Sequence, residues 1–190
     1  QCREGVMWHT FTREHNQSMY DVDKIIIPMT AKDTIATYIS NRGLYMDNAN
    51  VWFITIPNAD SKIMKAITCV INSTVFSVLG KAGANPQTGE YYKFNKQFLT
   101  PIPFPSVKLT ADSEAVLYLS SIFDEITELQ DRYLVATQNQ KEVFTRALKE
   151  KWSDLDEVCF NLYEVTDVEK AQIQAIGRTI SRIDLLNGAE

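Results

Sequence analysis

The segment from Lys81 to Lys96 combines the two kinds of side chain that a protein needs to read a DNA sequence. Amide and hydroxyl groups exchange hydrogen bonds with base edges, and ammonium groups hold the phosphates on either side. Tyr91 or Tyr92 could pack against a sugar or a base. We therefore predict a DNA-contacting loop whose candidate residues are Lys81, Asn85, Gln87, Thr88, Tyr92, Lys93 and Lys96. An ordinary surface loop, with its aromatic side chains facing the core, explains the same composition.

A second polar connector, residues 41–50, offers the same combination of a cation and side-chain amides. Its candidate DNA-contacting residues are Arg42, Asn48 and Asn50. Plain turn chemistry also explains these residues, because asparagine and glycine favour the backbone conformations of tight turns. The composition leaves both interpretations open.

Sequence motifs for catalysis are absent. A DNA adenine methyltransferase needs a polar-Pro-Pro-aromatic segment and a glycine-bearing loop for S-adenosylmethionine, and the sequence contains neither. Asp60 and Lys62 could suggest a metal-dependent nuclease, but Asp60 or Ser61 more often serves as the N-cap of the following helix. His9 and His15 do not have the spacing of a zinc module. We expect a binding protein with no catalytic residue, no metal ligand and no cofactor in this chain.

The composition of the 190 residues fits a folded domain, with 45% hydrophobic and 11% aromatic residues. Three widely spaced cysteines do not resemble a disulfide framework, and no apolar run reaches the roughly 20 residues that span a bilayer. We therefore expect a cytoplasmic protein, and the start at Gln1 suggests a chain cut from a longer one. Residues 1–108 contain 11 basic and 8 acidic residues, whereas residues 109–190 contain 8 and 16. A polyanion should prefer the first part.

The spacing of apolar residues predicts an α+β fold, with a small, twisted, mainly antiparallel sheet and a packed helix. Residues 24–28 read KIIIP, a short β-branched run typical of a strand. Residues 43–47 and 51–56 are expected to form a hairpin, and residues 61–80 one helix with a buried face. A loop over 81–89 and a strand over 91–94 should follow.

The proline-rich run at 101–105 suggests a boundary, which divides the chain into an α+β target-recognition domain (1–108) and a helical C-terminal region (109–190). In the second part, apolar residues follow a helical period from 112 to 151. The polar residues 137–140 are either part of one long helix or a break in it. Further helices are expected at 153–163 and at 166–186, the last opened by a capping box.

The order of several segments resembles the Taq-type specificity domain of gamma-class DNA adenine methyltransferases and type IIG restriction-modification enzymes. The segments are KIIIP at 24–28, YMDN at 45–48, VWFI at 51–54, INSTVF at 71–76, LTPIP at 99–103 and LDEVCFNLYEVT at 155–166. The resemblance implies a bacterial target-recognition domain for double-stranded DNA. A separate methyltransferase domain of the parent protein would use S-adenosylmethionine, and a nuclease domain could accompany it. We interpret Asn72 and Ser73 as structural residues that bond to backbone.

Specificity subunits of type I restriction-modification systems resemble the same segments, so a specificity-subunit-like protein-interaction module is the alternative. The helix expected over 112–151 has an apolar stripe and an acidic opposite face, which could pair with another subunit. The closing LDE and LY residues at 155–163 favour the single-chain methyltransferase family.

Overall fold

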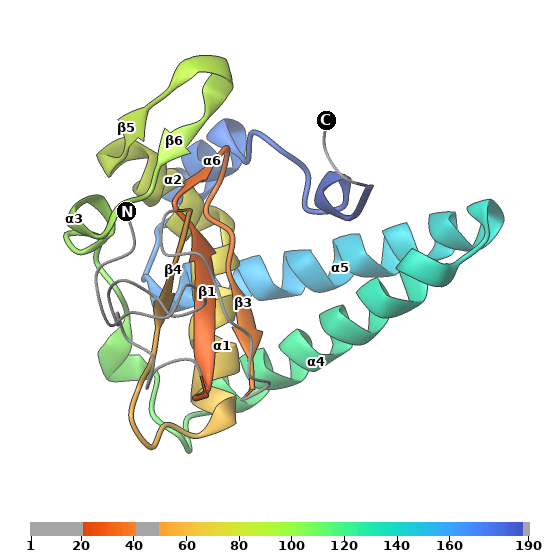
Figure 1. Ribbon diagram of the computed structural model, residues 1–190, viewed down its shortest axis with the longest axis horizontal. Coiled ribbons are helices and arrows are strands. Elements are labelled where there is room, and N and C mark those ends of the chain that lie inside the picture. The colour runs from red at the N-terminus through yellow and green to blue at the C-terminus, as the bar shows by residue number, and fades with distance from the viewer. Residues whose placement is uncertain (1–20, 41–49, 188–190) are drawn as a thin grey trace, which may run out of the picture.

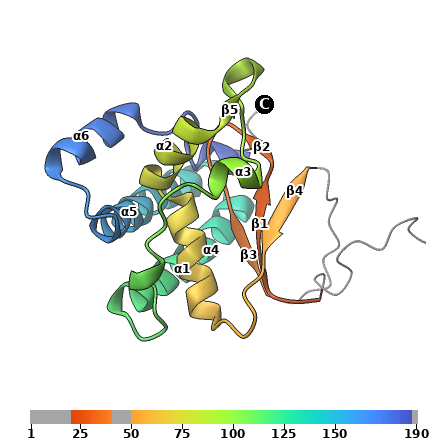
Figure 2. The ribbon, with the colours of Figure 1, turned by 90° about the vertical axis from the view of Figure 1, so that its left-hand side faces the viewer.

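The computed structural model describes residues 21–40 and 50–187, which form two small antiparallel sheets packed with helices (Figure 1). The predicted α+β class and the mainly antiparallel pairing are therefore confirmed. Figure 2 shows the first sheet as one layer and the helices stacked on one side of it. Short elements complete the described chain: the helix α3 (Lys96–Leu99) and the 3-10 turns η2 (Thr88–Glu90), η3 (Ser106–Lys108) and η4 (Asp184–Asn187).

The first sheet has β1 (Lys24–Pro28) at its centre, between β3 (Thr37–Ile39) and β4 (Val51–Ile54). The predicted strand at 24–28 is confirmed with its bounds, and Ile25 and Ile27 are buried where β1 faces the helices. β4 pairs with β1, whereas the hairpin partner predicted for it, 43–47, lies outside the described residues. β3 was not predicted, because three residues carry too little periodicity to identify a strand.

The second sheet is smaller and has the order β2-β6-β5, made of Thr30–Ala31, Tyr92–Lys93 and Asn85–Pro86. Both pairings are antiparallel, so β5 and β6 form a hairpin (Figure 1). The predicted strand at 91–94 is thus present in its central two residues. The predicted loop at 81–89 is partly wrong, because its first three residues end a helix and two others form β5.

The helix expected over 61–80 is in fact two helices, α1 (Ser61–Asn72) and α2 (Thr74–Gly83), with 63° between them. Asp60 caps α1, as predicted, by accepting a hydrogen bond from the backbone N–H of Lys62 at 2.9 Å. Ser73 causes the break, since its backbone is extended and its hydroxyl accepts from the N–H of Phe76. A serine inside an apolar periodic run therefore starts a second helix instead of continuing the first.

The helical stretch expected over 112–151 is interrupted at the polar residues 137–140, which was one of the two predicted possibilities. α4 (Glu114–Val135) and α5 (Gln138–Leu162) are joined at Thr137, whose capping box with Gln140 starts α5. The two helices fold back on each other as a hairpin that extends away from the sheets (Figure 1). The separate helix expected over 153–163 is the end of α5, because no breaking residue interrupts the run before Tyr163.

The last helix, α6 (Asp167–Ile176), begins with the predicted capping box between Thr166 and Glu169. The prediction that it reaches Leu186 is wrong, because Gly177 adopts a positive φ of 59° that ends the helix. The following residues cross the molecule as an irregular strap, residues 177–183, which lies against the junction of α1 and α2 through hydrogen bonds from Arg178 and Arg182.

One hydrophobic cluster joins both parts of the chain. It includes Ile25 and Val70 from the first part and Leu119, Leu148 and Leu155 from the second. α1 packs against both the first sheet and α4. The division at residue 108 stays a prediction, but the core extends across it.

Within residues 21–40 and 50–187, no single helix is long and apolar enough to cross a membrane. Only α1 and α2 taken together reach that length and apolarity, and they are bent and largely buried against the sheet and α4.

Candidate nucleic-acid interface

The three side chains predicted to read base edges, Asn85, Gln87 and Thr88, are all exposed on the β5–β6 hairpin. The hairpin turns through Gly89 and Glu90, which both have positive φ, at 74° and 64°. A backbone hydrogen bond of 2.7 Å from the N–H of Gln87 to the carbonyl of Tyr91 closes the turn. The tip therefore has a defined shape and presents neutral polar groups and one carboxylate, that of Glu90, to solvent.

The base of the hairpin is anchored in the protein by Phe94, which is 1% exposed. Its N–H donates to the carbonyl of Met29 at 2.8 Å, and its carbonyl accepts from the indole N–H of Trp52 at 3.1 Å. These bonds join the hairpin to the ends of β1 and β4. A recognition loop needs such support, because a mobile loop would lose conformational entropy on binding.

The structure brings Asn50, the last residue of the second predicted connector, to the same place. Met29 accepts from Phe94 through its carbonyl and donates its N–H to the carbonyl of Asn50 at 2.8 Å. Asn50 is exposed, so its side chain lies on the surface beside the hairpin base. Arg42 and Asn48, the other candidates of that connector, lie outside the described residues.

Lys93 and Lys96 are both exposed and follow the hairpin tip, as a pair of phosphate-contacting residues requires. A third cation, Lys32, was not predicted for this surface, and its ammonium group lies 5.5 Å from the centre of the Tyr91 ring. Lys32 follows β2, which pairs with β6, and a two-residue strand gave no signal that would have linked the two segments.

Lys81 does not lie on this surface, which argues against its predicted phosphate contact. Its ammonium group forms an ion pair with the buried carboxylate of Asp33 and donates to the hydroxyl of Thr179 at 2.8 Å. Burial raises the pKa of Asp33, but the hydrogen bond from Lys81 and the charge of Arg178 outweigh burial and lower that pKa overall. Lys81 therefore stabilises the fold by pairing with a buried carboxylate.

The two tyrosines of the hairpin have different surroundings. Tyr91 is exposed beneath Lys32, whereas Tyr92 is half-buried and stacks on Phe94 with 6.2 Å between ring centres. Tyr92 was the predicted contact. The geometry makes Tyr91 the better placed of the two to pack against a sugar or base, and Tyr92 part of the anchor.

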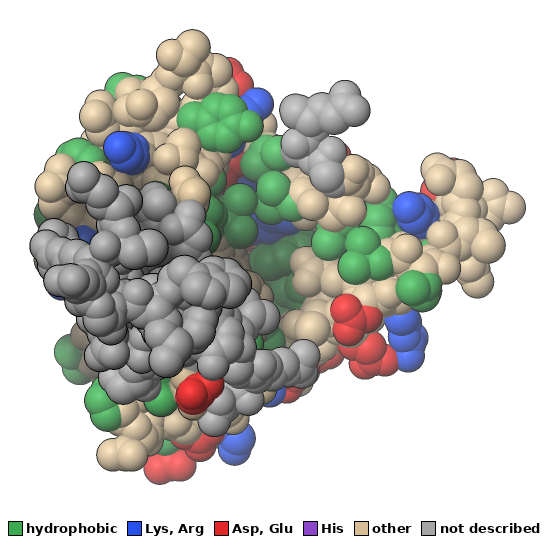
Figure 3. Space-filling view, in the orientation of Figure 1, with side chains coloured by type: hydrophobic (Ala, Val, Ile, Leu, Met, Phe, Trp, Pro, Cys, Tyr) green, Lys and Arg blue, Asp and Glu red, His purple; other side chains and the backbone are tan. Residues whose placement is uncertain are grey.

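The surface around the hairpin carries few carboxylates. Glu90 is the one acidic residue between Lys81 and Lys96, and it is exposed at the turn. In the space-filling view, red acidic side chains gather along the α4–α5 hairpin and at the lower end of the molecule, whereas the upper lobe is mostly uncharged (Figure 3). A polyanion approaching the β5–β6 hairpin would therefore meet little repulsion.

Asn72 and Ser73, which match a family segment, are engaged within the fold. The side-chain amide of Asn72 accepts from the N–H of Ala36 at 2.9 Å and donates to its carbonyl at 2.8 Å. The Ser73 hydroxyl donates to the carbonyl of Val70 at 2.7 Å and caps α2. The prediction that both bond to backbone is confirmed, although Asn72 reaches a segment 36 residues away in sequence.

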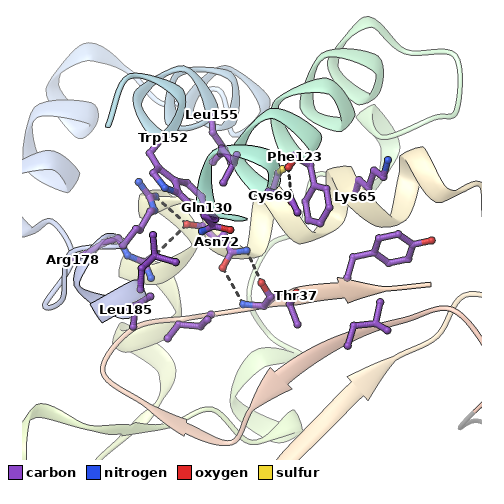
Figure 4. Close-up of a pocket in the computed structure, with 18 of the residues that line it drawn as sticks. Thr37, Lys65, Cys69, Asn72, Phe123, Gln130, Trp152, Leu155, Arg178 and Leu185 are labelled. Atoms are coloured by element: carbon purple, nitrogen blue, oxygen red, sulfur yellow. Dashed lines mark hydrogen bonds between the residues drawn. The ribbon is translucent and has the colours of Figure 1, made fainter. Parts of the chain in front are cut away.

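A separate cleft of about 510 Å³ lies between β3 and the helical hairpin, and the strap closes one end of it. Figure 4 shows Phe123, Gln130 and Trp152 on the helical side, with Arg178 and Leu185 at the strap end. Within the described residues, no group of three or more His, Cys, Asp or Glu side chains could hold a metal ion. Cys69, which also lines the cleft, has a raised pKa because it is buried, so it is a poor nucleophile.

Comparison of the chain with protein-family models gives no match, and comparison with curated proteins gives no significant relative.

Proposed function

We propose that this chain is the target-recognition domain of a restriction-modification DNA adenine methyltransferase and that it reads double-stranded DNA through the β5–β6 hairpin. The observation that carries the proposal is the exposure of Asn85, Gln87 and Thr88 on a hairpin whose base is fixed by Phe94. A two-stranded ribbon fits the major groove, which is about 12 Å wide. Side-chain amides there distinguish bases, adenine above all, through paired hydrogen bonds.

The cations around the hairpin supply the binding that does not depend on sequence. Lys93 lies opposite Asn85 in the hairpin, Lys96 is exposed at the start of α3, and Lys32 lies over Tyr91. Asn50 extends the polar surface beside them. Phosphate contacts fix the position of the duplex, and base contacts then select the site.

Catalysis would belong to the parent protein, in a cytoplasmic bacterial setting. The methyltransferase domain would bind S-adenosylmethionine and extract the adenine, at a cost of a few kcal/mol for unstacking. The recognition domain would hold the flanking base pairs in register. A nuclease domain of the parent could cut the same site.

Selection from a pool of random DNA duplexes tests the proposal. We expect the chain at low ionic strength to enrich one short motif, and the Asn85→Ala variant to enrich an altered one. A matched control, Gln97→Ala, changes an exposed amide in α3 and should keep the original motif. The proposal would be abandoned if the folded wild-type chain enriched no motif, or if Asn85→Ala and wild type enriched the same one.

A second candidate function, a protein-interaction module like a type I specificity subunit, has one observation in its favour. Apolar side chains are exposed near the connection of α4 and α5: Leu134 at 59%, Val135 at 87% and Val143 at 67%. An exposed apolar group of this kind is typical of a subunit contact. Light scattering at rising protein concentration would show a dimer that Val135→Asp abolishes; a strictly monomeric wild-type chain would remove self-association as its basis.

A further inference from the structure

The outer edge of β3 faces the cleft beside the helical hairpin. Six consecutive residues, 35–40, line the cleft, and the middle three, Thr37–Ile39, form β3. A strand exposes consecutive residues to a cavity when its edge, rather than one face, points at it. β3 is at the end of its sheet, since the order is β3-β1-β4 in the described residues. An edge strand offers backbone N–H and C=O groups to another extended chain.

Asn72 shows which backbone groups point into the cleft. Its side-chain amide bonds to both the N–H and the C=O of Ala36, as a residue of a neighbouring strand would. In an antiparallel pair, hydrogen-bonding groups alternate between the two edges of a strand. The N–H and C=O of Tyr38 and Ser40 therefore point the same way as those of Ala36, along the line that Asn72 begins. Figure 4 shows Asn72 reaching this segment from the helical side.

The helical wall opposite the edge combines apolar side chains with two polar residues of α4, Thr127 and Gln130. Phe123 and Ile126 from α4 and Trp152 and Leu155 from α5 line it. Alternate side chains of a strand added to β3 would point towards this wall, because successive side chains of a strand lie on opposite faces. The cleft therefore combines a backbone template with a surface for apolar side chains, which are the two elements of strand addition.

One end of the cleft carries a cation whose charge is only partly balanced. Arg182 forms an ion pair with Asp156 at 2.9 Å and lies over the Trp152 ring. Arg178 donates to two neutral carbonyls, those of Asn72 at 3.1 Å and Thr34 at 2.9 Å, and no carboxylate of the described chain is hydrogen-bonded to it. The two carboxylates that interact with its charge, Asp33 and Asp156, are already paired with Lys81 and Arg182. At the rim, Lys65 pairs with Asp124. This end favours a carboxylate.

We propose that the cleft binds an extended peptide segment, which adds to the outer edge of β3 and places a carboxylate near Arg178. The backbone of the segment pairs with Tyr38 and Ser40, and its apolar side chains contact Phe123 and Trp152. This site is distinct from the DNA-reading hairpin, since the cleft lining includes no residue between 81 and 96.

A phage-displayed library of short random peptides, selected on the intact chain, supplies the probe. We expect enriched peptides to alternate apolar residues and to share an acidic position. Replacing that residue by its amide should weaken binding about tenfold, because a charge-assisted hydrogen bond is removed. Amidation of the peptide C-terminus shows whether the carboxylate is terminal or belongs to a side chain. Weaker binding after C-terminal amidation identifies a terminal carboxylate, and weaker binding after the side-chain change identifies a side-chain carboxylate.

Two pairs of variants test where the peptide binds. Thr127→Trp fills the cleft from an exposed position of α4, and Ser121→Trp makes the same change on α4 outside the cleft. Ser40→Pro removes an edge N–H, and Ser40→Ala keeps it. The first member of each pair should lower affinity about tenfold and the second should leave it within about twofold. Equal binding by wild type and Thr127→Trp, or no enrichment above that obtained on Thr127→Trp, would overturn the proposal.

Discussion

The β5–β6 hairpin and the α4–α5 hairpin both project from the body of the molecule, but different forces hold them (Figure 1). Backbone bonds to neighbouring strands and one buried side chain, Phe94, fix the first. Burial of a long apolar stripe fixes the second, including Leu148 and Leu155, both fully buried. A segment that needs little apolar surface for its own stability can present polar groups, and that is what a base-reading surface requires.

The two hairpins also differ in how their charged side chains are paired. Cations of the β5–β6 region, such as Lys93 and Lys96, have no ion pair to a carboxylate of the described chain. On the α4–α5 hairpin, Lys151 pairs with Glu125 at 2.7 Å and Arg132 with Glu128 at 2.5 Å. The hydrogen bond from Lys151 lowers the pKa of Glu125. Part of the charge on the helical hairpin is therefore held in internal pairs, whereas Lys93 and Lys96 on the strand hairpin have no such pair within the described residues.

The largest expected difference in the free energy of unfolding is between the Lys81→Ala and Lys93→Ala variants. Lys81→Ala leaves the buried carboxylate of Asp33 without its main partner, and breaking a buried pair in this way costs about 3–5 kcal/mol. Lys93→Ala, on the exposed hairpin, should change the free energy of unfolding by less than about 0.5 kcal/mol. Urea denaturation measures both. Equal losses would mean that Lys81 and Lys93 have the same structural role.

A comparable loss is expected in the helical hairpin. Leu155→Ala removes a fully buried side chain that contacts the shared core, so the free energy of unfolding should fall by about 2–5 kcal/mol. Val143→Ala, at an exposed position of the same helix, is the matched control and should have little effect. If both parts of the chain share one core, Leu155→Ala should also lower protection of the β1 amides in hydrogen exchange; unaltered β1 protection would indicate two independent domains.

Protonation of the Asp33 carboxylate should contribute to the loss of folding stability at acid pH. This carboxylate accepts from the N–H groups of Thr179 and Ile180 as well as from Lys81, and its folded-state pKa is below the ordinary value of 3.8. The stabilisation is therefore complete above that value and is lost as the pH falls through the lower, folded pKa. In Asp33→Asn this acid-side loss should be smaller. An unchanged pH profile in the variant would assign the acid sensitivity to other carboxylates.

Smaller effects are expected at the tip. On the duplex selected by the wild type, Asn85→Ala or Gln87→Ala should lose about 1–3 kcal/mol of discrimination between the preferred base pair and its alternatives. The unfolding midpoint should stay the same, because both side chains are exposed. Competition binding with single-base variants of the duplex measures the loss. Uniform weakening for all duplexes would instead identify these residues as backbone contacts.

Local signals in the sequence predicted several elements correctly. β1 was predicted from its β-branched run, the start of α1 from a cap at Asp60 or Ser61, and the start of α6 from the Thr166–Glu169 capping box, since each depends on residues within one turn or strand. The kink at Ser73 was missed because apolar periodicity continues through it. β2 and β3 are stabilised by partners distant in sequence, and so is the ion pair between Lys81 and Asp33.

The same limit applies to the candidate site. The exposed residues 85–88 were predicted from residue types alone. That Lys32 joins the candidate surface, that Lys81 is absent from it, and that Tyr91 and Tyr92 differ in their surroundings all depend on contacts between segments distant in sequence. The cleft beside β3 needs Arg178, which is more than 100 residues from Asn72, its hydrogen-bond partner. No local pattern relates such residues.

The salt dependence of duplex binding tests the central claim most directly. Removing one lysine that neutralises a phosphate should reduce the slope of log affinity against log salt by about 0.9. The double variant Lys93→Ala/Lys96→Ala should therefore show a slope that is shallower by about twice that amount, whereas Lys62→Ala/Lys149→Ala, with exposed lysines on α1 and α5, should match the wild type. If both double variants kept the wild-type slope, the β5–β6 hairpin would not be the surface that meets DNA.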